Sequence, residues 1–314
     1  MKRAWKEVLL AVGLGVGAPW LILGIAAAGT EPALQTQTTE GVMLTQPHLI
    51  QVLTQNGTVE MDLEEYLVGV LLCEIPESFD QEAKKAQAVV ARTYTLRTVT
   101  HKDKHPFDAV CTSPDCCQGY VSAEAYTGSR AGVESARRAV SDTEGLVLTY
   151  DRALIDATYF SCSGGMTEDA VAVWGADVPY LKAVSSPGEE QATHYTDTVI
   201  FSSEGFQEAL GLKLQGKPGY WLGEVTYTAG GGVDTMVIGG KSYQGTELRK
   251  ALGLRSTAFT MTVAGDSVII TTKGFGHRVG MSQYGAEAMA VNGSGYEEIL
   301  KHYYQGTSLT MIEP

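Results

Sequence analysis

The chain contains the stretch Leu63-Glu-Glu-Tyr-Leu-Val-Gly-Val-Leu-Leu-Cys-Glu74-Ile-Pro76, which predicts an amphipathic helix ending at a carboxylate. Its apolar stripe at helical spacing comprises Leu63, Tyr66, Leu67, Val70 and Leu71. Glu74 takes the next position on that stripe, and a glutamate in an apolar environment has the raised pKa of a general acid. Pro76 ends the helix because the residue before a proline is pushed out of the α region. We therefore expect Glu74 beside a core, where a cleft can open.

The composition disfavours one class of partner. The chain has 314 residues, with 36 acidic and 23 basic side chains and a formal net charge of −13. Nucleic acid is a poor partner for such a chain, because binding phosphates requires a basic face. The charge places no restriction on an uncharged substrate. The length is sufficient for one large domain or two modest ones.

The first 45 residues are predicted to lie outside the folded domain. Residues 1–7 are short and basic, and residues 8–28 carry no charge over a length that spans a bilayer as a helix. The basic residues place the N-terminus in the cytoplasm by the positive-inside rule. Cleavage at Ala26-Ala-Ala-Gly29 is the alternative, although the apolar run is long for a signal peptide. Residues 29–45 are typical of a linker, so residues 46–314 form an extracytoplasmic domain behind one anchor.

Helix and strand signals follow one another irregularly along this domain. Asn56-Gly57 closes a predicted hairpin at 48–60, and Asp62 with Glu65 caps the first helix. Ser78 and Gln81 predict the start of a second helix at 79–97. Further helices are expected at 130–140, 282–291 and 296–304, and strands are expected at 146–150 and 155–161. Residues from about 196 to 273 are predicted to be a strand-rich subregion that includes a helix capped by Thr246. Because strands and helices do not alternate regularly, the fold class is predicted to be α+β.

A zinc-type ligand set is gathered within 13 positions at His105, Cys111, Cys116 and Cys117. One imidazole and three thiolates complete a closed tetrahedral site, so the metal would be structural. The spacing is not a paired C-x-x-C pattern, and His101 competes with His105 as the imidazole ligand. A disulfide such as Cys111–Cys117 is the alternative, because the exterior is oxidising.

Two glycine-rich clusters, residues 159–168 and 274–285, carry hydroxyl, amide and imidazole groups that suit a sugar. Glycine lets backbone approach a ligand closely. Tight turns with solvated polar residues are the alternative for each cluster. A Ser–His–Asp site with Ser163 and His277 is disfavoured, because no G-x-S-x-G elbow surrounds Ser163 or Ser282. The candidate sugar-binding residues are Tyr159, Ser163, Gly164, Thr167, His277, Ser282, Gln283 and Tyr284.

Three motifs, in order, resemble the signatures of the SpoIID family, the stage II sporulation D lytic transglycosylases related to the amidase enhancers. The first runs from Glu74-Ile-Pro through Glu82-Ala-Lys-Lys85 to Arg92-Thr-Tyr94. The second is Ser163-Gly-Gly-Met-Thr-Glu168 with Val173-Trp-Gly and Pro179-Tyr-Leu. The third is Gly274-Phe-Gly-His277-Arg-Val-Gly-Met-Ser-Gln-Tyr-Gly285. The likeness covers residues 45–310 or so.

The resemblance implies cleavage of peptidoglycan between N-acetylmuramic acid and N-acetylglucosamine, with a 1,6-anhydro end formed without water. It gives Glu74 the position of the catalytic acid, and Lys85 and Arg92 match positions implicated in the site. These two cations share a helix face that is expected to point towards Glu74. Ordinary glycosidases need two carboxylates. A transglycosylase can use one, because the sugar's own 6-hydroxyl attacks after Glu74 has protonated the leaving oxygen.

Two departures from the family pattern bear on the site. Some clostridial members hold zinc in this loop through two His and two Cys, so zinc here would use Cys116 where a His is expected. Arg278 replaces the Gly usual after His277 and is expected to crowd the cleft.

The resemblance also implies a cellular setting. We expect a sporulation enzyme in the mother-cell membrane facing the forespore, acting on glycan strands stripped of stem peptides during engulfment. A sporulation amidase and a membrane scaffold protein are the implied partners. A non-catalytic wall-binding amidase enhancer is the alternative, and a zinc hydrolase with an open coordination position is a third interpretation.

Overall fold

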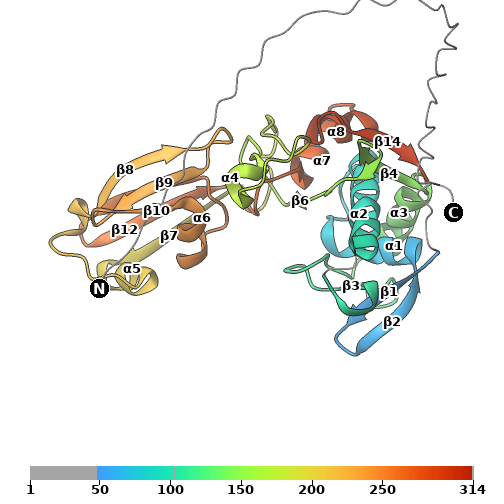
Figure 1. Cartoon of the computed structure of the whole chain (residues 1–314), viewed down its shortest axis with the longest axis horizontal. Helices are drawn as coiled ribbons and strands as arrows, with labels where there is room; N and C mark the ends of the chain where they lie inside the picture. The colour runs from blue at the N-terminus through green and yellow to red at the C-terminus, as the bar shows by residue number, and fades with distance from the viewer. Residues whose placement is uncertain (1–47, 102–103, 313–314) are drawn as a thin grey trace, which may run out of the picture. The chain divides into compact units, whose positions relative to one another are not determined.

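The structure is a computed structural model that describes residues 48–101 and 104–312 (Figure 1). The predicted cytoplasmic segment, membrane helix and linker (residues 1–7, 8–28 and 29–45) lie outside the described residues. Among the residues that the structure describes, no helix is both long and apolar enough to cross a membrane. Helices and short strands are mixed along the chain, which confirms the α+β fold class.

Helix α1 (Leu63–Glu74) has the predicted bounds and ends at the candidate acid. The Asp62 carboxylate accepts a hydrogen bond from the Glu65 amide at its start. Ile75 leaves the helix in an extended conformation before Pro76, as the proline requires. All five residues of the predicted apolar stripe are buried. Burial of each of the four aliphatic side chains among them stabilises the fold by roughly 1.5–3 kcal/mol relative to exposure.

The predicted hairpin lies before α1 and continues into a small sheet. β1 (Leu49–Thr54) pairs antiparallel with β2 (Gly57–Asp62), and Thr54 lies opposite Gly57. The turn residues are Gln55 and Asn56, one position earlier than the predicted Asn56-Gly57 pair. β3 (Val110–Cys111) pairs in parallel with β1, with Cys111 opposite Leu53. This pairing fixes one end of the Cys/His loop on the sheet.

Helix α2 (Gln81–His101) is the element on which two hydrophobic cores meet. One side packs on α7, α8 and β4, and the other packs on α1 and α3 (Figure 1). The predicted start near Ser78 is wrong, because Asp80 provides the carboxylate that accepts from the Glu82 amide. The partners are α3 (Arg130–Ser141), β4 (Leu146–Tyr150), α7 (Gln283–Val291) and α8 (Tyr296–Tyr303).

Strand pairing joins the two glycine-rich clusters. β6 (Tyr159–Phe160) runs parallel to β13 (Met281–Ser282), and isolated bridges continue the contact at Cys162 with Phe275. Only two residues of the predicted strand 155–161 pair in this way, so that strand is much shorter than expected. The remaining elements here are β5 (Ala153–Leu154), β14 (Ser308–Met311), the short helix α4 (Ala170–Trp174) and the 3-10 turn η1 (Pro106–Asp108).

The region from 196 to 273 is strand-rich, as predicted, and has its own core. It contains two antiparallel three-stranded sheets, ordered β10-β9-β8 and β11-β12-β7. Its second helix begins at Gly245 and is capped by Gln244 rather than by Thr246. The elements are β7 (Thr196–Ser202), α5 (Ser203–Leu210), η2 (Pro218–Tyr220), β8 (Leu222–Tyr227), β9 (Val233–Ile238), β10 (Lys241–Gln244), α6 (Gly245–Ala251), β11 (Phe259–Ala264) and β12 (Ser267–Lys273).

Candidate active site

Glu74 lies at the end of α1 with its carboxyl half-buried. Burial raises the pKa of this carboxyl, and hydrogen bonds from Gly119, Tyr159 and Gln283 lower it in part. The Gly119 amide donates to Oε1 at 2.5 Å, and the Gln283 amide also donates to the Glu74 backbone oxygen at 3.2 Å. Burial dominates, so the carboxyl holds its proton to higher pH than an exposed glutamate does. This is the shift that the apolar stripe predicted.

Gly119 is a site residue that the sequence did not reveal. A Cβ at this position would lie 2.7 Å from the Cys73 sulfur and 3.0 Å from Glu74 Oε1. Only glycine can therefore bring its amide so close to the acid. Its neighbour Gln118 is fully buried, accepts from the Thr95 hydroxyl at 2.8 Å and donates to the Tyr159 hydroxyl at 3.4 Å. The one available signal was the Gln-Gly pair directly after the predicted metal ligands.

Glu74 opens into a cleft of about 700 Å³. The Cys/His loop, both glycine-rich clusters and α6 all contribute to its wall. Trp174 is 45% exposed, and its ring lies 5.3 Å from that of His277 at a tilt of 48°, so aromatic surface is available to a sugar ring. Burial and then the charge of Arg249 lower the pKa of His277 to about 4, so its imidazole is neutral at pH 7. The lining residues are Glu74, Tyr94, Pro114, Asp115, Cys116, Cys117, Thr158, Tyr159, Phe160, Ser161, Trp174, Arg249, Phe275, Gly276, His277 and Gln283.

Three of the eight predicted sugar-binding residues line this cleft, namely Tyr159, His277 and Gln283. Thr167 does not, and its hydroxyl instead accepts from the Val184 amide at 2.8 Å. Tyr284 also lies outside the lining and packs edge-on against Phe79 at 5.0 Å.

A buried carboxylate explains why the other three, Ser163, Gly164 and Ser282, do not line the cleft. Glu189 is 1% exposed and accepts from the Ser163 amide and hydroxyl at 2.7 and 2.8 Å. The Gly164 amide donates to it at 2.9 Å, and the Ser186 and Ser282 hydroxyls complete the set. The donors that were expected to hold a sugar therefore satisfy Glu189, which the sequence analysis did not single out.

Arg92 and Lys85 do not pair with Glu74, contrary to the expectation from their shared helix face. Arg92 is fully buried, and its guanidinium binds both carboxylate oxygens of Glu64 at 2.8 and 2.6 Å. Glu64 precedes Glu74 by ten residues on α1, or about 15 Å along the axis. Lys85 pairs with Glu82 at 3.0 Å and with Asp142 at 3.3 Å. Over the described part of the chain, no cation forms an ion pair with Glu74.

Arg278 does not crowd the cleft, because its side chain is buried in the protein. Its guanidinium pairs with Glu168 at 3.1 Å and donates to the carbonyl oxygens of Ser163, Met166 and Gly230. The residue keeps the left-handed φ of 67° that a glycine would adopt at no steric cost. Arg278 thus links both glycine-rich clusters to the strand-rich region.

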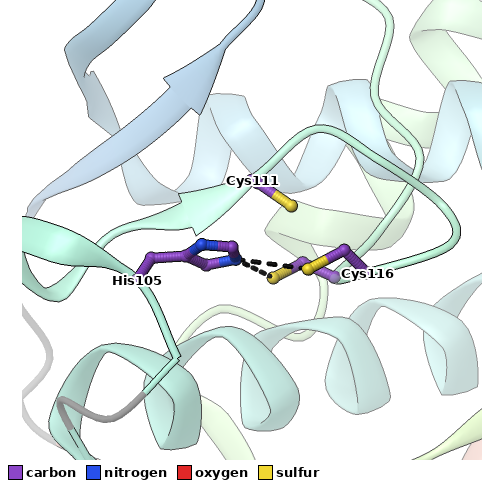
Figure 2. A group of neighbouring side chains, drawn as sticks. His105, Cys111 and Cys116 are labelled. Atoms are coloured by element: carbon purple, nitrogen blue, oxygen red, sulfur yellow. Dashed lines mark hydrogen bonds between the residues drawn. The ribbon is translucent and has the colours of Figure 1, made fainter.

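The four predicted metal ligands come together, with all their donor atoms within 4.8 Å of one another. Figure 2 shows the imidazole of His105 directed at the Cys116 sulfur, with Cys111 beside them. His105 Nε2 lies 3.3 Å from Cys117 Sγ and 3.4 Å from Cys116 Sγ. Tetrahedral zinc bonds separate such donors by roughly 3.5–3.8 Å. The cluster can therefore hold a metal ion of this kind.

The alternatives for this loop are not realised in the structure. All five cysteines, which are described residues, are free thiols, so the Cys111–Cys117 disulfide is not formed. His101 lies outside the cluster and binds the Arg97 carbonyl oxygen at 2.9 Å. Lys104, which follows α2, ties the loop to this helix, since its ammonium donates to the hydroxyl of Tyr94 on α2 at 2.7 Å and to the Cys116 carbonyl oxygen. Two of the cluster's ligands, Cys116 and Cys117, also line the cleft.

Comparison with known proteins assigns the family. Residues 54–150 match the family model described as SpoIID, stage II sporulation protein. The chain is 40% identical to stage II sporulation protein D of Bacillus subtilis over 266 residues, which cover 82% of this chain and 77% of that protein. It is 31% identical to the amidase enhancer of Bacillus subtilis, covering 78% of this chain and 40% of that protein. The chain therefore belongs to the SpoIID family of stage II sporulation proteins.

Proposed function

We propose that this protein is a lytic transglycosylase of sporulation that cleaves peptidoglycan glycan strands between N-acetylmuramic acid and N-acetylglucosamine. The observation that carries the proposal is the raised pKa of Glu74, a half-buried carboxyl that opens into a cleft of about 700 Å³. Such a group keeps its proton to higher pH than an exposed glutamate does and can donate it to a glycosidic oxygen. Trp174 and the polar edge formed by Tyr159 and Gln283 suit a sugar ring above it.

The reaction needs one acid that becomes a base. Glu74 gives its proton to the leaving oxygen as the bond from that oxygen to the muramyl C1 breaks. The carboxylate then takes the proton of the 6-hydroxyl while the 6-oxygen bonds to C1, so Glu74 ends protonated and the sugar closes as a 1,6-anhydro ring. The Gly119 amide, Tyr159 hydroxyl and Gln283 amide stabilise the intermediate carboxylate without a cation.

Product chemistry separates this reaction from hydrolysis. Asp115 is the other carboxylate in the lining, and it is exposed on the Cys/His loop. A hydrolase would need it as nucleophile or as base for water. Incubation of the full chain with denuded strands should give anhydro ends by mass spectrometry, and Glu74→Gln should lower their yield at least 10³-fold. Asp115→Asn should retain activity; reducing ends, or no product from wild type, would refute the proposal.

The metal cluster has a structural role in this proposal. When bound, zinc would be held by His105, Cys111, Cys116 and Cys117 and would cross-link the loop that carries Gly119. Three thiolates and one imidazole leave no open position, so no chemical step is assigned to the metal. Metal analysis should give one zinc per chain, and chelation should lower the melting temperature together with activity. Loss of activity with an unchanged melting temperature would favour the zinc hydrolase instead.

The setting of the enzyme follows from the family and the N-terminal sequence. Residues 8–28 would anchor the protein in the mother-cell membrane with residues 1–7 in the cytoplasm and the domain facing the forespore. We expect a sporulation amidase, which would strip the strands, and a membrane scaffold protein as partners. Protease accessibility in sporangia and co-purification with these proteins test this part of the proposal.

A non-catalytic amidase enhancer is the second candidate, favoured by the 31% identity to a protein of that name. Such a protein would use the same cleft for binding alone. It predicts amidase stimulation and glycan binding that survive Glu74→Gln, with no anhydro ends from wild type.

A further inference from the structure

Arg249 is a charged side chain that the strand-rich region contributes to the cleft. It lies in the last turn of α6 and lines the cleft together with Glu74, Trp174 and His277. Over residues 48–101 and 104–312, its guanidinium has no carboxylate at ion-pair distance and no hydrogen-bond acceptor. Burial alone lowers the pKa of Arg249, with no neighbouring anion opposing it.

Three other buried or partly buried arginines of this protein form ion pairs with carboxylates. The fully buried Arg92 binds Glu64, and the buried Arg278 binds Glu168. Arg255, about a third exposed, pairs with Asp197 at 3.2 Å. Arg249 is half-buried, and a guanidinium without a counter-charge loses part of its hydration there, with no group of the described residues in its place. At Arg249 this deficit lies in the wall of a cleft, where an anionic group of a ligand can supply the missing partner.

The helix that carries Arg249 is held firmly. Gln244 and Glu247 form a reciprocal capping box at its start, and Leu248 is buried in the core of the strand-rich region. A Cβ at Gly245 would lie 1.8 Å from the Val233 carbonyl oxygen, so the helix begins in close contact with β9. The backbone that carries Arg249 is therefore already ordered, so a ligand that binds there loses little free energy in ordering it.

We propose that Arg249 binds a carboxylate on the glycan strand, namely the lactyl carboxylate that N-acetylmuramic acid exposes once its stem peptide is removed. The planar fork of a guanidinium matches a carboxylate through two parallel hydrogen bonds. An attached stem peptide turns this carboxylate into a neutral amide, which cannot pair with Arg249. Arg249 would thus account for the use of stripped strands that the family resemblance implies, and this inference rests on the proposed function.

Binding in the Glu74→Gln background tests this without turnover. The full chain is titrated with three probes: denuded strands, denuded strands whose carboxylates have been converted to methylamides, and strands that keep their stem peptides. Glu74→Gln should bind the first probe about 10- to 100-fold more tightly than the other two. Adding Arg249→Gln should remove this preference, and adding Arg249→Lys, which keeps the charge but not the fork, should remove part of it. Adding Lys250→Gln, at the exposed neighbouring position, should leave it unchanged.

The outcomes separate this inference from the enzyme proposal. Equal binding of free and methylamidated strands by Glu74→Gln would overturn the inference, as would a preference that persists with Arg249→Gln. Peptide-bearing strands could instead bind tightly and lose affinity with Arg249→Gln. That result would place the carboxylate in the stem peptide and overturn the lactyl assignment. A preference that depends on Arg249, in a protein whose wild type yields no anhydro ends, would support the inference and refute the enzyme proposal.

Discussion

Glu189 is buried and Glu74 is half-buried, and the two differ in the groups that surround their carboxyl oxygens. Glu189 is 1% exposed and accepts from Ser163, Gly164, Ser186 and Ser282 on all sides. Glu74 has fewer donors and faces the cleft. Both carboxylates lie next to motifs that the sequence marked as chemical, so proximity to a motif does not identify the acid.

The difference teaches how a fold separates a structural carboxylate from a reactive one. Hydrogen bonds to a carboxylate favour its charged form, and several of them fix its position. At Glu74, burial outweighs the hydrogen bonds and raises the pKa of the carboxyl. A proton is then available on the side that is open to a ligand. The predictions below test this contrast, from the largest expected effect to the smallest.

Glu189→Ala should destabilise the domain by about 3–5 kcal/mol, because five donor interactions lose their acceptor in the interior. Urea unfolding followed by circular dichroism measures the change. Glu190→Ala, at the exposed neighbouring position, should lie within 0.5 kcal/mol or so of wild type. If the two variants unfold alike, the Glu189 network does not hold the glycine-rich clusters together.

Gly119→Ala should lower kcat roughly 100-fold, because the new methyl group would displace the amide that donates to Glu74. The rate of anhydro-end formation measures this effect. Gly219→Ala is the matched control, since a Cβ there meets nothing within 4 Å. A fully active Gly119→Ala would show that Glu74 does not depend on this close approach.

Glu74→Gln should be more stable than wild type at pH 7, by about 2 °C in melting temperature. The folded-state pKa of Glu74 is raised, so wild type loses stability as pH rises through that pKa, and the neutral amide avoids the loss. Below the ordinary glutamate pKa both forms are neutral, and the difference should vanish. A Glu74→Gln protein that is less stable than wild type at pH 7 would contradict the burial argument.

Tyr159→Phe should move the descending limb of the pH–rate profile to higher pH. The Tyr159 hydroxyl lowers the pKa of Glu74, so its loss lets the acid stay protonated in more alkaline solution. Tyr284→Phe serves as the control, because Tyr284 packs against Phe79 outside the cleft lining. A limb that shifts equally in both variants would remove Tyr159 from the set of groups that tune the acid.

Much of the architecture was predictable because it depends on local signals. The bounds of α1, the β1–β2 hairpin, the C-terminal helices and the α+β class follow from periodicity, turn residues and caps. The metal cluster was predictable because its four ligands lie within 13 positions of one another. The start of α2 was misplaced although its cap is local, because Asp80 accepts from the Glu82 amide only two residues away. The shortened strand β6 does depend on a partner distant in sequence, since it pairs with β13.

The sequence by itself determined that a glutamate ends an apolar helix, that a ligand set for a metal follows, and that the chain resembles the SpoIID family. The first two features are each encoded in one short stretch of chain, and the resemblance is carried by three short motifs. Only the tertiary structure decided that Arg92 serves Glu64, that Ser163 and Ser282 serve Glu189, and that Arg249 reaches the cleft. A side chain's partner depends on which distant donors, acceptors and charges the fold brings near, and hydrophobic periodicity carries no information about that choice.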